Sequence, residues 1–257
     1  LHLLRDLTAK YPSWSVWKNP ESAFSGPGDI DSLAPPAVWD DIEQTFREWA
    51  DSYGLSPVIV CRHVPQGPHF IAIDPEWPHM LILDVKKCST WRGSTLIDHR
   101  QLQEVSIIGD QGFRRVRPGA EGVLKLLLNG TLKGGKPNPE GLEGKGVIPL
   151  LESDPEGVEL ASRWMGPLSG TLRSAVDTLL QGGWDRRSMV AIEAWAVLRS
   201  LKEPRTAVSR LVFNRYTLPR CQILRSVRYD HRRVPDDRET WIEEISVDHE
   251  VDVVPTS

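Results

Sequence analysis

The chain has 257 residues, of which 40% are apolar and 26% are charged, and this composition excludes a disordered or fibrous protein. Such a length can bury one core of ordinary size, or a core domain with a helical appendage. The formal net charge of −4 excludes general adhesion to nucleic acid or anionic lipid, so any basic surface must be local.

The cysteines and the apolar runs predict where the protein resides. Cys61, Cys88 and Cys221 form no CxxC pair, and an odd number of cysteines predicts reduced thiols in a cytoplasmic protein. The first ten residues carry Arg5 and Asp6 among their leucines. No later apolar run approaches the roughly 20 residues that span a bilayer. We therefore expect a soluble, unsecreted protein that does not contact a membrane.

In chain order, the first half alternates short β-rich runs with one clear helix. Residues 13–17 predict a strand, and residues 36–53 predict a helix that begins with prolines and ends at Gly54. The apolar face of this helix has spacings of four, four, three and four residues, at Val38, Ile42, Phe46, Trp49 and Tyr53. Further strands are expected at residues 57–63, 69–73 and 80–86.

The second half shows mainly helical periodicity. A leucine-rich helix is expected from Pro118 to residue 132, with Gly134 and Gly135 as its C-terminal cap, and a polar loop is expected at residues 136–146. Asp154 is the expected N-cap of the next helix. Predicted helices cover residues 155–165, 169–181, 185–200 and 205–216, and residues 245–253 predict a strand.

These elements predict an α+β fold with two parts. Residues 1–117 are expected to form a mixed sheet with flanking helices, and residues 118–257 a mainly helical domain with a short acidic tail. The charges of this second part are uneven. Between Arg199 and Arg228 there are eight basic residues and one acid, a net charge of +7, whereas residues 229–257 carry −6. One interpretation is that the two segments neutralise each other or simply face water. The other is that the basic segment binds RNA or nucleotide phosphates.

The most informative stretch begins at Lys18, where a strand is expected to end. Asn19 is the expected N-cap of a short helix, and a turn at residues 26–28 leads to Asp29 and Asp31 on the next strand. Residues i and i+2 of a strand point to the same face, so the two carboxylates can converge.

The two carboxylates repel each other unless a cation is present. Mg²⁺ or Mn²⁺ prefers carboxylate and phosphate oxygens, and a helix N-terminus binds phosphate, so the stretch indicates a metal-bound nucleotide. The alternative is a solvated turn.

Asp84 interrupts the apolar strand at residues 80–86. An unpaired ionised carboxylate in a core is costly, so Asp84 requires a partner. One alternative is a pair with Lys86, Lys87 or an arginine. The other is a strand beside that of Asp29 and Asp31, where three acids could hold two metals roughly 3.5 to 4 Å apart for phosphoryl chemistry.

The sequence lacks the motifs that are typical of several other kinds of active site. No spacing among the seven histidines supplies four zinc ligands, and HExxH, GxSxG, the Walker A motif and GxGxxG are missing. Zinc, hydrolase-triad, P-loop kinase and dinucleotide-binding interpretations are therefore not supported.

Over roughly residues 1–150, the chain resembles the nucleotidyltransferase fold of the DNA polymerase β superfamily. It is most similar to nucleotidyltransferase-like domains that are sometimes fused to thymidylate-kinase-like domains. The motifs that carry the resemblance are Trp17-Lys18, Gly28-Asp29-Ile30-Asp31, Leu83-Asp84-Val85, Trp91-Arg92-Gly93 and Leu132-Lys133-Gly134-Gly135.

The resemblance implies transfer of a nucleoside monophosphate from a nucleoside triphosphate (NTP) to a hydroxyl acceptor, with release of pyrophosphate. The acceptor would be a small molecule, an RNA end or a protein, and the basic segment keeps RNA among these partners. Asp29, Asp31 and Asp84 would bind the metal, and Asp84 would also help to deprotonate the acceptor. Candidate phosphate contacts are Lys18, Asn19, Arg92, Lys125 and Lys133, although the last three are also typical of surface charges in water.

One departure from the superfamily affects this function. Trp17-Lys18 stands where the superfamily usually has Gly-Ser to cradle the triphosphate. Lys18 could offer its ammonium group to a phosphate, or the exchange could signal weakened nucleotide binding. The alternative function is therefore a regulatory module that binds a nucleotide or a partner protein without turnover.

Overall fold

The computed structural model describes residues 1–18, 29–62, 66–76, 80–202, 204 and 208. The chain divides into two compact units, Leu1–Arg220 and Cys221–Ser257, and every described residue lies in the first. The described residues are 53% helix and 23% strand. A mixed sheet with flanking helices, as predicted, is confirmed. The expected boundary at residue 117 falls within the first unit and stays a prediction.

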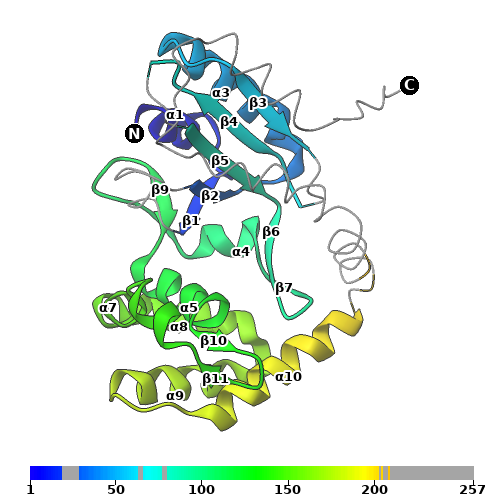
Figure 1. Cartoon of the computed structure of the whole chain (residues 1–257). Coiled ribbons are helices and arrows are strands. Elements are labelled where there is room, and N and C mark those ends of the chain that lie inside the picture. Colours follow the sequence, from blue (N-terminus) through cyan, green and yellow to red (C-terminus); the bar gives the residue numbers. More distant parts are fainter. Residues whose placement is uncertain (19–28, 63–65, 77–79, 203, 205–207, 209–257) are drawn as a thin grey trace, which may run out of the picture. The chain divides into compact units, whose positions relative to one another are not determined.

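A seven-stranded mixed sheet has the order β3-β4-β5-β2-β1-β9-β8 (Figure 1). Its strands are β1 (Ser15–Lys18), β2 (Asp29–Leu33), β3 (Val58–Cys61), β4 (His69–Ile73), β5 (Met80–Lys86), β8 (Ser106–Ile108) and β9 (Arg114–Val116). The pairs β2–β5 and β1–β9 are parallel, and the other neighbours are antiparallel. The strands predicted from the first half of the sequence are therefore confirmed, with shifts of a few residues at some ends.

Two helices, α1 (His2–Lys10) and α3 (Trp39–Ser52), pack into the apolar core on one face of this sheet. Leu7 and Phe46 from the helices are fully buried there with Leu83 of β5. The predicted helix at residues 36–53 is confirmed as α3, with a short 3-10 turn, η1 (Pro36–Val38), before it. Its last apolar position, Tyr53, is exposed instead of buried. Helix α1 was not expected from the sequence.

A hairpin and a short helix connect β5 to the far edge of the sheet. The hairpin consists of β6 (Cys88–Trp91) and β7 (Ser94–Asp98), and α4 (His99–Glu104) follows directly. Asp98 and Gln101 form a capping box at the start of α4, which satisfies backbone donors that would otherwise lack a partner.

The second half consists mainly of helices. They are α5 (Pro118–Leu128), α6 (Pro139–Glu143), α7 (Val147–Ser153), α8 (Pro155–Ser162), η2 (Arg163–Leu168), α9 (Ser169–Leu180) and α10 (Arg186–Lys202). The predicted helices at residues 155–165, 169–181 and 185–200 are confirmed. Helix α5 is the most buried of these elements and packs on α7 and α8. The core around α5 also contains Trp17 and Leu33 from β1 and β2, so the sheet takes part in this second buried cluster as well as in the one with α1 and α3.

The end of α5 corrects one prediction. The helix stops at Leu128, because the following residues turn into a small hairpin, β10 (Thr131–Leu132) and β11 (Lys136–Pro137). Gly134 and Gly135 have φ of +74° and +63°, which glycine adopts without strain. They form the turn of this hairpin and do not cap α5. The expected loop at residues 136–146 accordingly contains β11 and α6.

Some predictions lie outside the described residues. These are the short helix that begins at Asn19, the helix at residues 205–216 and the strand at residues 245–253. In the part of the chain that the structure describes, none of the helices combines the length and apolar character needed to cross a membrane.

Candidate functional site

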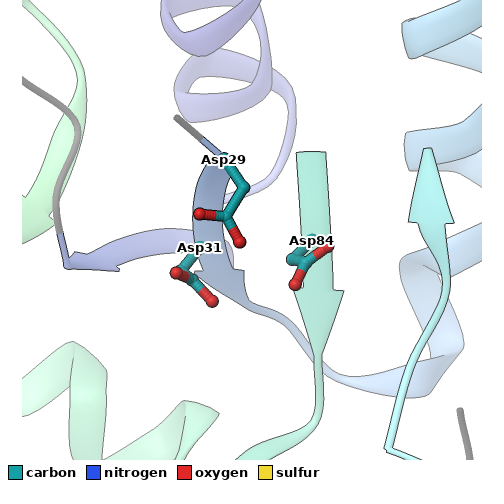
Figure 2. A group of neighbouring side chains, drawn as sticks. All are labelled: Asp29, Asp31 and Asp84. Carbon is teal, nitrogen blue, oxygen red and sulfur yellow. The ribbon is translucent and has the colours of Figure 1, made fainter. Parts of the chain in front are cut away.

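Three carboxylates meet where β2 and β5 run side by side in the sheet. Asp29 and Asp31 lie on β2, and Asp84 lies on β5 (Figure 2). One oxygen of each carboxylate lies within 4.8 Å of the others. The predicted convergence of these residues is confirmed, although Asp84 lies more than 50 positions after Asp31 in the chain.

Strand alternation and parallel register explain the convergence. Ile30 and Leu83 point into the core with α1 and α3, so the carboxylates next to them point to the opposite face. In the parallel β2–β5 pair, Asp31 stands opposite Asp84. Asp31 and Asp84 are only 1% and 3% exposed, whereas Asp29, at the start of β2, is exposed.

Two lysines contact the buried carboxylates. Lys18 stands opposite Asp31 across the β1–β2 pair, and its Nζ lies 3.0 Å from Asp31 Oδ2. Lys86 Nζ lies 3.3 Å from Asp31 Oδ1 and 2.9 Å from Asp84 Oδ2. Lys86 therefore bridges the two acids, as the alternative pairing of Asp84 predicted.

The remaining oxygen of Asp84 contacts a histidine on the neighbouring strand. His69 of β4 stands opposite Asp84 in the antiparallel β4–β5 pair, and its Nδ1 hydrogen-bonds to Asp84 Oδ1. Each carboxylate oxygen of Asp31 and Asp84 thus has a side-chain nitrogen as its neighbour.

These contacts set the charge state of the cluster. Burial would raise the pKa of Asp84, but the hydrogen bond from His69 and the charge of Lys86 outweigh it and lower the pKa to about 2. Burial raises the pKa of Asp31, and the nearby Lys86 and Lys18 offset this only in part. Burial would lower the pKa of Lys86, but Asp84 and Asp31 raise it. Lys86 and Asp84 are therefore both ionised at neutral pH.

Two of the predicted phosphate contacts have other partners in the structure. Arg92 Nε lies 2.9 Å from Glu193 of α10, and its guanidinium also donates to the carbonyl of Thr131. Lys125 is buried on α5, and its Nζ lies 2.7 Å from Glu121. These pairs tie the β6–β7 hairpin to α10 and stabilise α5. The proposed roles of both residues toward phosphate stay predictions.

Of the two remaining predicted phosphate contacts, the structure describes one. Lys133 is exposed between β10 and β11. Asn19 lies outside the described residues, as does most of the basic segment. The first residue of this segment, Arg199, donates to the carbonyls of Trp164 and Thr95, so its guanidinium joins α10 to η2 and β7.

Sequence reasoning missed His69 as a neighbour of the carboxylates and treated Lys86 as one of several partners for Asp84. The spacing of Lys86, two residues after Asp84 on a strand, is a signal for a shared face. No equivalent signal exists for His69, because its position beside Asp84 depends on the pairing of β4 with β5.

Chemically, the site combines three anionic oxygen donors with two ammonium groups. Carboxylate oxygens are the ligands that Mg²⁺ and Mn²⁺ prefer, so the donor set fits a divalent cation. The same residues also form a buried ion-pair network that compensates much of its own charge.

Comparisons with known proteins give little further information. No family model and no curated protein matches the chain. The crystal structure of JHP933 from Helicobacter pylori is similar over 82% of this chain and 93% of that chain, with a TM-score of 0.37 and 12% sequence identity. A likeness this low assigns neither a fold family nor a function.

Proposed function

We propose that this protein is a metal-dependent nucleotidyltransferase that transfers a nucleoside monophosphate from an NTP to a hydroxyl acceptor and releases pyrophosphate. One observation carries the proposal: Asp29 and Asp31 on β2 converge with Asp84 on the parallel neighbour β5, with oxygens within 4.8 Å of one another. A pair of acids two residues apart, joined by a third from an adjacent strand, is the arrangement that the resemblance to the DNA polymerase β superfamily implies.

The residues present fit Mg²⁺ or Mn²⁺. Asp29, Asp31 and Asp84 would hold the cation, and a bound divalent cation supplies charge stabilisation for phosphoryl transfer. The low pKa of Asp84, about 2, keeps its carboxylate ionised, which is the form that binds a cation. The same low pKa makes it a weak base, so we favour cation binding over proton removal from the acceptor as its main role.

The ammonium groups beside the carboxylates suit an anionic substrate. Lys18 and Lys86 are each partly open to solvent, with side-chain exposures of 25% and 20%. A triphosphate that approaches the carboxylates would find both cations within the same cluster. Lys18 and Lys86 are therefore the residues of this cluster that we expect to orient the phosphates of the NTP.

The test combines a binding and a turnover measurement. Isothermal titration of NTP should show binding with Mg²⁺ or Mn²⁺ and none with EDTA, and an acceptor panel should yield pyrophosphate. Asp29→Asn and Asp31→Asn should each abolish turnover, because each removes an anionic oxygen donor. Asp51→Asn, an exposed change on α3, is the matched control and should retain full activity. Turnover that survives in both site variants would contradict the proposal.

A specific observation favours the second candidate, a module that binds a nucleotide or a partner without turnover. Lys18 and Lys86 already pair with the buried carboxylates, and they reduce the net charge that would attract a cation. Metal-dependent NTP binding without any pyrophosphate, across a broad acceptor panel, would favour this function over the transferase.

A further inference from the structure

Lys86 occupies the space between the two buried carboxylates of the cluster. Its Nζ lies 3.3 Å from Asp31 Oδ1 and 2.9 Å from Asp84 Oδ2, so a single ammonium group contacts one oxygen of each acid. A divalent cation held by Asp31 and Asp84 would need oxygens of the same two carboxylates. The ammonium group and the cation would therefore compete for these carboxylates.

The other nitrogen neighbours do not compete in the same way. Lys18 contacts only Asp31, and it contacts the other oxygen, Oδ2. Of the two buried acids, His69 contacts Asp84, again at the other oxygen, Oδ1. Of these three neighbours, Lys86 is the one whose nitrogen contacts both acids.

We propose that Lys86 is a built-in counter-ion that holds Asp31 and Asp84 together in the metal-free protein and leaves when a divalent cation binds between them. Lys86 then sets the metal affinity of the site, because binding must break two charge-assisted contacts. Lys86 is thus a positioning residue, because it holds the two carboxylates together. This inference rests on the metal site of the proposed function.

The first experiment titrates Mn²⁺ alone into the full chain by calorimetry. Lys86→Met should bind Mn²⁺ more tightly than the wild type, by about tenfold or more, because a unit charge within 4 Å of the ligands is removed. Lys87→Met is the matched control: it removes the same charge from the next residue, which is exposed, and should leave the affinity unchanged. Lys86→Gln, which keeps a hydrogen-bond donor without the charge, should behave as Lys86→Met.

A second measurement uses the wild-type protein and does not depend on whether a variant folds. Acetylation of lysines by an N-hydroxysuccinimide ester, read by mass spectrometry, should modify Lys86 several-fold faster at saturating Mn²⁺, because its amine has left the carboxylates. Lys87 serves as the internal reference and should react at the same rate with and without Mn²⁺.

The outcomes separate the inference from the proposed function. If Mn²⁺ binds the wild type and Lys86→Met equally and Lys86 labelling does not rise, the counter-ion role is wrong while the metal site stands. If Mn²⁺ binds neither protein, both the inference and the metal-dependent function are wrong.

Discussion

Asp31 and Asp84 share Lys86 as a neighbour, yet their pKa values shift in opposite directions. Burial dominates at Asp31 and raises its pKa. At Asp84 the His69 hydrogen bond and Lys86 prevail and lower the pKa to about 2. A raised carboxyl pKa means that folding disfavours the ionised form, and a lowered pKa means that folding favours it. The two acids should therefore respond differently to loss of their charge.

Asp84→Asn should destabilise the fold at neutral pH by about 2 kcal/mol, the value that corresponds to its pKa shift. Asp31→Asn should cause no loss, because it removes a charge whose burial is unfavourable. Urea unfolding followed by tryptophan fluorescence measures both, with Asp51→Asn as the control. If Asp31→Asn and Asp84→Asn lost the same free energy of unfolding, the opposite pKa shifts of the two acids would be wrong.

The same shift predicts a pH dependence. Because the folded pKa of Asp84 lies below its ordinary value of 3.8, its contribution is fully present above about pH 4 and is lost as the pH falls toward 2. The stability difference between wild type and Asp84→Asn should therefore be constant near neutral pH and should shrink between about pH 4 and 2. Denaturation curves of both proteins across this range provide the measurement, and a difference that grows on acidification would contradict it.

At the scale of elements, one aspartate joins the starts of α5 and α8. The Asp154 side chain accepts from the backbone N–H of Gly157 and of Gly119 and pairs with Arg117 through both oxygens. The N-cap predicted for Asp154 is thus confirmed. Its link to α5 was not predicted, because α5 lies more than 25 residues away in the chain and local signals do not reach so far.

Asp154→Ala should destabilise the protein by about 1–2 kcal/mol, the usual cost of losing an N-cap. Glu156→Ala is the matched control, since Glu156 also pairs with Arg117 but its side chain is 71% exposed. Exposed ion pairs contribute little, so this control should show no measurable loss in thermal or urea unfolding. If Glu156→Ala destabilised the protein as much as Asp154→Ala does, the effect would come from the ion pairs with Arg117 and not from the N-cap.

At the scale of the whole molecule, the sheet contributes apolar side chains to two buried clusters, one with α1 and α3 and one with the helices that follow residue 117. Trp17 and Leu33 of the sheet lie in one buried cluster with Leu124 of α5 and Trp164. Separation of the sheet from the helices would expose these side chains to water, which is unfavourable. The expected boundary at residue 117 marks a change of secondary structure within this shared core.

We therefore expect residues 1–202 to unfold in one cooperative transition. Far-UV circular dichroism and tryptophan fluorescence should give coincident midpoints, because the helices and the sheet lose the shared core together. A fragment that ends at residue 117 should not show a cooperative transition of its own. Two separate midpoints in the full chain, or a stably folded fragment, would contradict this expectation.

By itself, the sequence determined most strands, the main helices and the face that Asp29 and Asp31 share, because strand and helix periodicity arises from nearby residues. It also identified Asp84 as an acid that needs a partner. The small hairpin after α5 was not predicted, and the end of that helix was wrong, since short elements leave weak periodic signals.

Only the tertiary structure decided which side-chain nitrogens surround the two buried acids. Lys18, His69 and Lys86 reach Asp31 and Asp84 through the order and register of β1, β2, β4 and β5. Strand pairing is a long-range property that depends on how the whole sheet buries its apolar faces. For this reason the carboxylates and a pairing of Asp84 with Lys86 could be proposed from the sequence, but the contacts of Lys18 with Asp31 and of His69 with Asp84 could not.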